Sequence, residues 1–380
     1  MIKAIVRPNS IALPTNYDLV RVPPTLDHPN SLKYFSTFDF HTVFSDIFLC
    51  GEEIRLVGPP YLNLREVLAA AEFRIDGGTT IDAAEIRWEE MDRMSRTSLP
   101  LIRSSELTWV PETVSLVLPD LELSSQIGAS HWDAFEGTNA LVTMNRNNRL
   151  ETIVQWVELN VQANDVDALL LFDNRSTWYS SKEVLDAVSA VDGIKTAVVV
   201  EWPHPYGALS KNLDSDFGQY TAWETAHWRF LKNARTVIIC DVDELMLSDD
   251  GRAVSELALK TGNGVLYMRS SDVPPVVARA SDQNSLRQHS DFIFKGVGPM
   301  GPRKYCYVPN RLLPQQQLKV HAVSYAHDNS PSQGTVRHFK GLHMAWREGL
   351  NSYSLPLIEN LEELEVDSRL FDLFQQYPDD

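Results

Sequence analysis

From residue 139 onward, short apolar runs alternate with longer stretches in which apolar residues recur every three or four positions. The runs cover residues 139–144, 167–172, 195–201 and 236–240, and their nearly unbroken apolar character is typical of strands buried on both faces. The stretches between them, over 150–161, 184–191 and 216–233, have the spacing of helices with one apolar face. This alternation predicts βαβ crossovers, and therefore an α/β fold with a mostly parallel sheet covered by helices on both faces.

The first 136 residues have a different pattern. Prolines recur, and short alternating stretches at 53–57, 72–75 and 115–118 predict short strands, with one helix over 64–71. We therefore expect a β-rich N-terminal domain of unassigned role over residues 1–136, an α/β domain over 137–350, and an acidic C-terminal helix and tail over 351–380. We interpret the acidic run in the last of these as a solvated face rather than a partner-binding surface.

Composition limits the class of protein. Hydrophobic residues make up 43% of the chain and charged residues 22%, which is typical of a globular protein. No apolar run approaches the roughly 18 residues that a bilayer span needs, and residues 1–10 lack the apolar segment of a secretory signal. The three cysteines, Cys50, Cys240 and Cys306, are too few and too widely spaced for a disulfide framework, so we expect a cytoplasmic protein.

The net charge of −17 argues against nucleic acid as a general partner. The same charge neither requires nor excludes peripheral association with a membrane through other proteins.

Polar residues follow three of the predicted strands directly: 145–148, 173–176 and 241–244. Ligands of open parallel sheets bind outside the carboxyl ends of the strands, so these three clusters are the natural candidates for a site. The strongest is Asp-Val-Asp-Glu at 241–244, where Asp241 and Asp243 are spaced so that both carboxylates can turn toward one hard cation. The sequence predicts Mg²⁺ or Mn²⁺ there, shared with the phosphate oxygens of a substrate.

Together these stretches resemble the GT-A glycosyltransferases of the family 2-like and family 92-like type. Residues 142–148 (VTMNRNN) and 170–176 (LLFDNRS) are similar to the opening of these enzymes, with Asn148 standing where the pattern has Glu. Residues 241–244 are similar to their D-x-D-E metal motif, and 303–309 (RKYCYVP), with His321 downstream, to a later segment. The resemblance spans about residues 139–346 and implies a GT-A fold preceded by a smaller β-rich domain.

The segment 338–346 (HFKGLHMAW) is similar to the H-F-x-G-x-x-K-P-W segment of family 8 transferases, with Met344 and Ala345 in place of Lys-Pro. In that family the histidine completes the metal site, so the resemblance implies His338 as a ligand beside Asp241 and Asp243. A neutral imidazole suits Mn²⁺ in such a set. For the donor we expect nucleoside contacts from Arg146, Asn147 and Asp173, and neutralisation of the diphosphate by Lys304 and Lys340.

The resemblance implies a metal-dependent hexosyltransferase. It would move a sugar from a nucleotide-sugar donor, with a UDP-sugar favoured, to a glycan or other hydroxyl acceptor, for example in surface polysaccharide synthesis. Glu348 and Asp272 are the two carboxylates that we consider as the base for the acceptor hydroxyl. The choice between them, and between an inverting and a retaining outcome, stays open.

Two other classes of protein remain as alternatives. Haloacid dehalogenase-type phosphatases also carry Asp-x-Asp after an apolar strand, but usually with Thr or Val at the fifth position, where this chain has Leu245, and near the start of the domain. A non-catalytic glycan- or partner-binding protein with a degenerate transferase fold is the other. Asp241, Asp243 and His338 are all present, which argues against degeneration.

Overall fold

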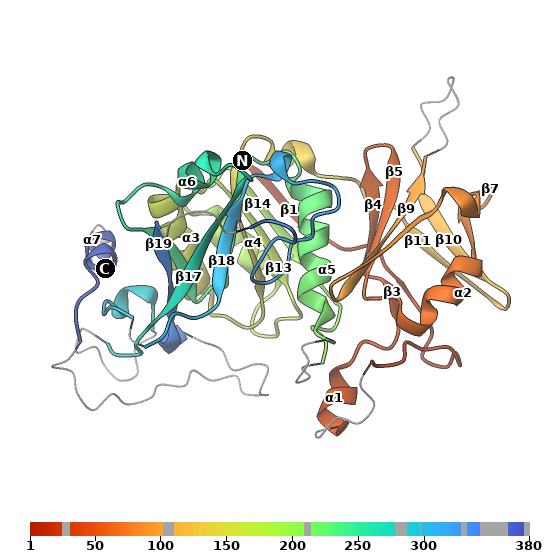
Figure 1. Cartoon of the computed structure of the whole chain (residues 1–380), viewed down its shortest axis with the longest axis horizontal. Coiled ribbons are helices and arrows are strands. Elements are labelled where there is room, and N and C mark those ends of the chain that lie inside the picture. Colours follow the sequence, from red (N-terminus) through yellow and green to blue (C-terminus); the bar gives the residue numbers. More distant parts are fainter. Residues whose placement is uncertain are drawn as a thin grey trace.

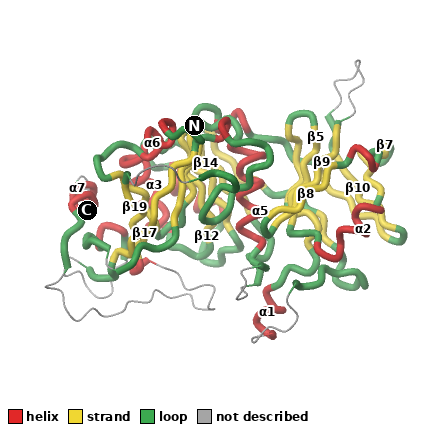
Figure 2. Tube along the Cα trace, in the orientation of Figure 1, coloured by secondary structure: helices red, strands yellow, loops and turns green. Residues whose placement is uncertain are grey.

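The computed structural model describes residues 1–24, 31–101, 110–208, 214–277, 287–296, 298–327, 333–342 and 364–375. In this part of the chain the strands form one nine-stranded sheet and three smaller sheets (Figure 1). The large sheet and its helices make up one side of the molecule, and the smaller sheets lie beyond α5 on the other side (Figures 1 and 2).

The large sheet has the strand order β1-β14-β13-β12-β15-β18-β17-β19-β16. Its strands are β1 (Ile2–Val6), β12 (Asn139–Asn145), β13 (Ala168–Asp173), β14 (Thr196–Glu201), β15 (Thr236–Ile239), β16 (Glu244–Ser248), β17 (Val265–Val273), β18 (Arg303–Tyr307) and β19 (Gly334–Phe339). The first five in the order run parallel, and β18 lies antiparallel to β15. The predicted mixed α/β fold with a large, mostly parallel sheet is therefore confirmed, and each of the four predicted strands ends within one residue of its predicted bounds.

Helices cover both faces of the parallel strands. On one face α3 (Leu150–Asn164), α4 (Ser181–Ser189) and α6 (Val254–Lys260) pack through Trp156, Val184 and Leu257 onto Leu141 and Leu169 of the sheet. On the other face α5 (Phe217–Thr225) and the π-helical turn Ala226–Leu231 pack through Trp223 and Phe230 onto Val142 and Leu170. Because successive side chains of a strand point to opposite faces, the unbroken apolar strands of the sequence supply both cores.

The region between β1 and β12 is built from short strands. One four-stranded sheet contains β4 (Asp46–Cys50), β5 (Glu53–Gly58), β9 (Met94–Pro100) and β8 (Arg87–Met91); a second contains β11 (Leu121–Gln126), β10 (Thr113–Leu118), β6 (Glu72–Ile75) and β7 (Thr79–Thr80). The pair β2 (Ile11–Ala12) and β3 (Thr42–Phe44) and the helix α2 (Arg65–Ala70) complete a shared apolar core. Strands and a helix thus occur where the alternating pattern and the helical stretch predict them.

Strand β1 and helix α1 are among the elements of residues 1–136 that the sequence did not predict. Strand β1 pairs with β14 in the large sheet, so residues 1–136 contribute to both sides of the molecule. Its partner is almost two hundred residues away, and no local pattern reveals such a pairing. Helix α1 (Ser31–Thr37) is too short for propensity to define it. The end of α1 is instead held by aromatic packing. The ring of Tyr34 packs on that of Phe38, and Phe38 packs on Phe217 of α5.

Buried ion pairs join the small sheets to α5 and the turn after it. Nη1 of Arg96 on β9 lies 2.8 Å from Oε1 of Glu224, and Nη1 of Arg229 lies 2.8 Å from Oδ1 of Asp46 on β4. All four side chains are almost fully buried. Because a buried charge without its partner is costly, these pairs fix how the small sheets sit against the large one.

Near the C-terminus, α7 (Ser368–Phe374) begins at Asp367, whose carboxylate caps the helix and also pairs with Arg337 of β19, with Nε 3.0 Å from Oδ2. Leu370 is fully buried against Leu245 and Phe339. Of the predicted acidic segment 351–380, only residues 364–375 belong to the described structure, and the helix there packs on the core. Within the described residues, no helix has the length and apolar character needed to cross a membrane.

Candidate functional site

The order of the parallel strands reverses between β12 and β15. From β12 the chain moves to β13 and then β14 on one side, whereas β15 adds on the opposite side. In open α/β sheets a crevice forms at this point, outside the carboxyl ends of the strands. Residues 145–148 begin at the last residue of β12, and residues 241–244 come after β15 and Cys240, so two of the predicted polar clusters lie at this position.

The third cluster is tied to the first by hydrogen bonds. Asn145 Nδ2 donates to Asp173 Oδ1 at 3.1 Å and to the hydroxyl of Tyr179 at 2.9 Å. Ser176 Oγ donates to the same Asp173 oxygen at 2.5 Å. Burial raises the pKa of Asp173, and the hydrogen bonds from Ser176 and Asn145 oppose this shift. The ends of β12 and β13 thus form one preorganised polar surface.

Asn147 holds the loop after β12 against the loop after β13. Its backbone has a φ of 56°, in the left-handed region, which asparagine tolerates better than most residues. Its N–H donates to Ser176 Oγ at 2.9 Å, and its Oδ1 accepts from the N–H of Thr177 at 2.7 Å. The neighbouring Arg146 is half-buried. Arg146 and Asn147 are the two residues of this loop that we predicted to contact the donor nucleoside. The side chain of Asn147 instead helps to hold the two loops together.

The Asp-Val-Asp-Glu segment forms the tight connection between β15 and β16. The N–H of Asp241 donates to Glu244 Oε2 at 3.0 Å, and the N–H of Glu244 donates to the carbonyl of Asp241 at 3.0 Å. His289 Nε2 lies 2.8 Å from the carbonyl oxygen of Val242. Burial lowers the pKa of His289 to about 4, so its imidazole is neutral and donates this hydrogen bond from Nε2. These contacts fix the turn that presents both aspartates.

Lys304 of β18 lies under this turn. Its Nζ is 2.6 Å from Asp241 Oδ2 and 3.0 Å from Glu244 Oε2, and its side chain is only 4% exposed. Burial works against the charged ammonium, but the two carboxylates outweigh it and raise the pKa of Lys304 above its usual value. Lys304, which we predicted to contact the diphosphate, is therefore already paired with two acids in this structure.

Asp243 faces His338 instead. Strands β17, β19 and β16 lie side by side, and their register places Asp272 opposite His338 and His338 opposite Glu244. His338 Nε2 is 3.5 Å from Asp243 Oδ2, and its Nδ1 is 3.1 Å from Asp272 Oδ1. Burial lowers the pKa of His338, but the hydrogen bond and charge of Asp243 outweigh burial and raise it overall. The imidazole thus lies between two carboxylates.

The remaining predicted residues are divided between the described structure and the rest of the chain. Lys340 follows β19, and its Nζ lies 3.3 Å from Asp272 Oδ1. It therefore brings a second positive group to the carboxylate that His338 already contacts. Glu348, the other candidate base, lies outside the described residues.

The spacing of Asp243 and His338 suits two ligands of one divalent cation. Asp243 Oδ2 and His338 Nε2 are 3.5 Å apart, close to the roughly 3 Å that separates neighbouring ligands of an ion bound at about 2.1 Å. Among the described residues no group of three or more His, Cys, Asp or Glu side chains is arranged to hold a metal, and Asp241 is paired with Lys304. Mg²⁺ typically uses only one or two protein carboxylates together with substrate phosphates, so a pair of protein donors fits this chemistry.

Comparisons with known proteins give limited information. No protein-family model and no curated protein sequence matches the chain. Among solved structures, the fold is similar to the mannosyltransferase Ktr4p from S. cerevisiae, with 10% identity over 37% of this chain and 41% of that chain and a TM-score of 0.26. It is also similar to apo WbbM, a bifunctional glycosyltransferase, with 13% identity over 42% of this chain and 27% of that chain and a TM-score of 0.26.

Both of these structural neighbours are glycosyltransferases, and the similarity covers less than half of either one.

Three contacts of the site were not predicted from the sequence: Lys304 with Glu244, His338 with Asp272, and His289 with Val242. A signal for the first exists in the sequence. Lys304 shares a strand face with Cys306, which is fully buried in the core. A lysine on an otherwise apolar strand face indicates a buried acidic partner, because an unpaired charge there would be too costly.

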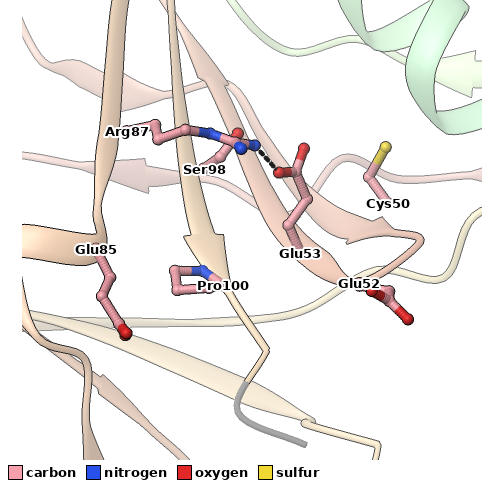
Figure 3. Close-up of a pocket in the computed structure, with 7 residues that line it drawn as sticks. All are labelled: Cys50, Glu52, Glu53, Glu85, Arg87, Ser98 and Pro100. Carbon is pink, nitrogen blue, oxygen red and sulfur yellow. Dashed lines mark hydrogen bonds and ion pairs between the residues drawn. The ribbon is translucent and has the colours of Figure 1, made fainter.

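A pocket of about 260 Å³ lies elsewhere, at the sheet that contains β4, β5, β8 and β9 (Figure 3). It is lined by Cys50, Glu52, Glu53, Glu85, Arg87, Ser98 and Pro100. Arg87 points toward Glu53 and pairs with it, and Arg55 pairs with the same carboxylate. None of the predicted site residues lies in this pocket, and Glu53 is neutralised by guanidinium groups of its own sheet.

Proposed function

We propose that this chain is a glycosyltransferase that moves a sugar from a nucleoside diphosphate sugar to a hydroxyl group of a glycan, with a divalent cation held by Asp243 and His338. The observation that carries the proposal is the closeness of these two side chains, next to the point of the sheet where the order of the parallel strands reverses. A UDP-sugar is the proposed donor and surface polysaccharide synthesis the proposed setting. Both follow from the sequence motifs that resemble GT-A enzymes.

In this proposal, the cation supplies Lewis-acid stabilisation of the diphosphate leaving group. Asp243 and His338 would offer one oxygen and one nitrogen to the cation. Lys304 holds Asp241 and Glu244, and thereby keeps the turn in place when the anionic diphosphate arrives. Lys340 adds positive charge next to the cation position, which favours the developing charge of the leaving group.

The nucleoside part of the donor is proposed to lie against the polar surface formed by the ends of β12 and β13. Asp173 is held there in a fixed geometry by Asn145 and Ser176, so its remaining hydrogen-bonding capacity is available without reorganisation. The half-buried Arg146 adjoins this surface. The base that accepts the proton of the acceptor hydroxyl stays a prediction, with Glu348 and Asp272 as its candidates.

A donor panel tests the proposal. Thermal unfolding of the full chain is measured with UDP-, GDP-, CMP- and dTDP-linked sugars, with and without Mn²⁺, for the wild type, Asp243→Asn and the exposed control Asp186→Asn. One donor class should stabilise the wild type and the control only when Mn²⁺ is present, by about 2.7 kcal/mol at a concentration of about 100 times its dissociation constant. Asp243→Asn should lose this stabilisation.

Two results would contradict the proposal. If Mn²⁺ and donors shift none of the proteins, nucleotide-sugar transfer is wrong. If the protein binds glycans without metal, or hydrolyses phosphate esters with no preference for nucleotide sugars, a binding protein or a phosphatase takes its place.

A further inference from the structure

The side chain of His338 lies between two carboxylates that contact different ring nitrogens. Asp272 Oδ1 is 3.1 Å from Nδ1, and Asp243 Oδ2 is 3.5 Å from Nε2. The three residues come from or adjoin neighbouring strands, with Asp272 and His338 directly opposite each other in the parallel register of β17 and β19. The N–H of Phe339 donates to the carbonyl oxygen of Asp243 at 2.8 Å, and this hydrogen bond holds the backbone of Asp243 next to β19.

A neutral imidazole carries one N–H, so only one of the two carboxylates can accept a hydrogen bond from it. The distance to Asp272 is that of an ordinary hydrogen bond, whereas 3.5 Å to Asp243 is at the limit. The neutral ring therefore places its proton on Nδ1 toward Asp272. In the neutral ring the lone pair of Nε2 then faces the carboxylate of Asp243, whereas in the charged ring Nε2 donates a hydrogen bond to it. A cation bound between the two side chains takes the place of that proton.

We propose that Asp272 is a positioning residue, which holds the Nδ1–H of His338 and so presents Nε2 beside Asp243 as a ligand for the divalent cation. The proposal deepens the proposed function and rests on it for the cation. Metal-binding histidines commonly donate their second N–H to a carboxylate in this way, and loss of that carboxylate typically lowers metal affinity by about 10- to 100-fold.

The surroundings of Asp272 agree with this role better than with that of a base. Its Oδ1 is within reach of both His338 Nδ1 and Lys340 Nζ, the latter at 3.3 Å. Lys340 begins the 3-10 turn Lys340–Leu342 directly after β19, and from there its side chain reaches the same oxygen of Asp272 as His338. A carboxylate that already accepts from two donors is less able to take a proton from an acceptor hydroxyl.

Two substitutions at Asp272 separate the two roles. Asp272→Asn keeps an oxygen that accepts the Nδ1–H but cannot serve as a base, whereas Asp272→Ala removes the acceptor as well. Lys340→Met is the matched control, because it removes the other donor to Asp272 and leaves the contact to His338 intact. Asp272 is partly exposed, so neither substitution leaves a buried charge unpaired.

The first readout is the tautomer of His338 in the metal-free full chain, at a pH above its raised pKa so that the ring is neutral. It is taken from the ring ¹⁵N signals of ¹⁵N-histidine protein, assigned by their loss in His338→Gln. The wild type, Asp272→Asn and Lys340→Met should hold the proton on Nδ1, and Asp272→Ala should give a mixture. An unchanged tautomer in Asp272→Ala would overturn the proposal. Since this readout needs no metal, it stands apart from success or failure of the proposed function.

The second readout is the affinity of the full chain for Mn²⁺ alone, by calorimetry, together with turnover on the donor that the panel selects. Asp272→Ala should bind Mn²⁺ about 10- to 100-fold more weakly, and Asp272→Asn within a few-fold of the wild type. Turnover should follow the same order. If both variants lose turnover equally while their Mn²⁺ affinity is unchanged, Asp272 is the base and the positioning role is wrong.

Discussion

Lys304 Nζ lies 2.6 Å from Asp241 Oδ2, so the first aspartate of the Asp-Val-Asp-Glu segment is paired with a cation of the protein itself. The second aspartate, Asp243, lies with its Oδ2 3.5 Å from Nε2 of His338. Two carboxylates that look equivalent in the sequence therefore have different neighbours. One anchors the turn to β18, and the other is placed to bind a ligand.

The pairing of Lys304 predicts a large effect on stability. Lys304→Met leaves the buried Glu244 without its partner, and breaking a buried pair in this way typically costs about 3–5 kcal/mol. The exposed Lys182, which pairs with Asp186 on α4, is the matched control, and Lys182→Met should cost at most about 0.5 kcal/mol. Urea unfolding at pH 7 measures both. A loss below about 1 kcal/mol for Lys304→Met would mean that the pair does not hold the turn.

His338 predicts how metal binding depends on pH. Its folded pKa is raised above about 6.5, and a proton on Nε2 competes with a metal for the same lone pair. Mn²⁺ affinity should therefore be constant at high pH and fall by about tenfold per pH unit once the pH drops below that raised pKa. Calorimetry between pH 6 and 9 tests this, with His338→Gln expected to bind weakly and without this dependence. A wild-type affinity that is flat over the whole range would exclude His338 as a ligand.

His289 predicts a loss of stability in acid. Its pKa is lowered to about 4 in the folded protein, whereas the unfolded chain has an ordinary histidine near 6.5. Between these values the unfolded state binds more protons, so this contribution is present above about pH 6.5 and is lost as the pH falls toward 4. The loss should be on the order of 3 kcal/mol.

His289→Gln, whose amide can still donate to Val242, is the comparison for that prediction. The difference in unfolding free energy between wild type and variant should shift in favour of the variant as the pH drops from 7 to 4.5. A difference that stays constant with pH would show that His289 does not titrate as described.

The link between the small sheets and α5 predicts a further effect. Arg96 lies 2.8 Å from the fully buried Glu224 and 2.7 Å from Glu89. Arg96→Met should destabilise the protein by about 3–5 kcal/mol, because Glu224 is left buried and unpaired. Arg96→Met with Glu224→Gln should recover part of this loss, since the charge is removed together with its partner. Failure of the double variant to recover stability would assign the effect to lost packing of Arg96 on Trp228.

The parallel half of the large sheet could be predicted because its signal is local. Strands β12 and β13 are almost completely buried, and each is followed by a helix with one buried face, α3 and α4. Strand β1 could not be predicted in this way, since its pairing with β14 is set by contacts far along the chain. Helix α1 was missed because aromatic contacts to α5, rather than helix propensity, stabilise it.

The position of the candidate site in the fold could be predicted from the sequence, but the contacts between its side chains could not. The sequence identified Asp241, Asp243 and Asp272 as polar groups after predicted strands, and His338 through the resemblance to family 8 transferases. The structure brings all four to neighbouring strands. Which group pairs with which depends on strand register, and in a sheet a shift of one residue moves a side chain to the opposite face. The division of the two aspartates between Lys304 and His338 could therefore only be read from the fold.

The central claim is that Asp243 and His338 hold a cation which in turn binds the diphosphate of the donor. The most direct test is the affinity of the full chain for Mn²⁺ with and without a saturating nucleoside diphosphate, taken in turn as UDP, GDP and dTDP. One nucleotide should tighten Mn²⁺ binding at least about tenfold, and Mn²⁺ should tighten binding of that nucleotide by the same factor, because such coupling is reciprocal. Asp243→Asn should lose the coupling. Independent binding of metal and nucleotide, or coupling that survives in Asp243→Asn, would contradict the account.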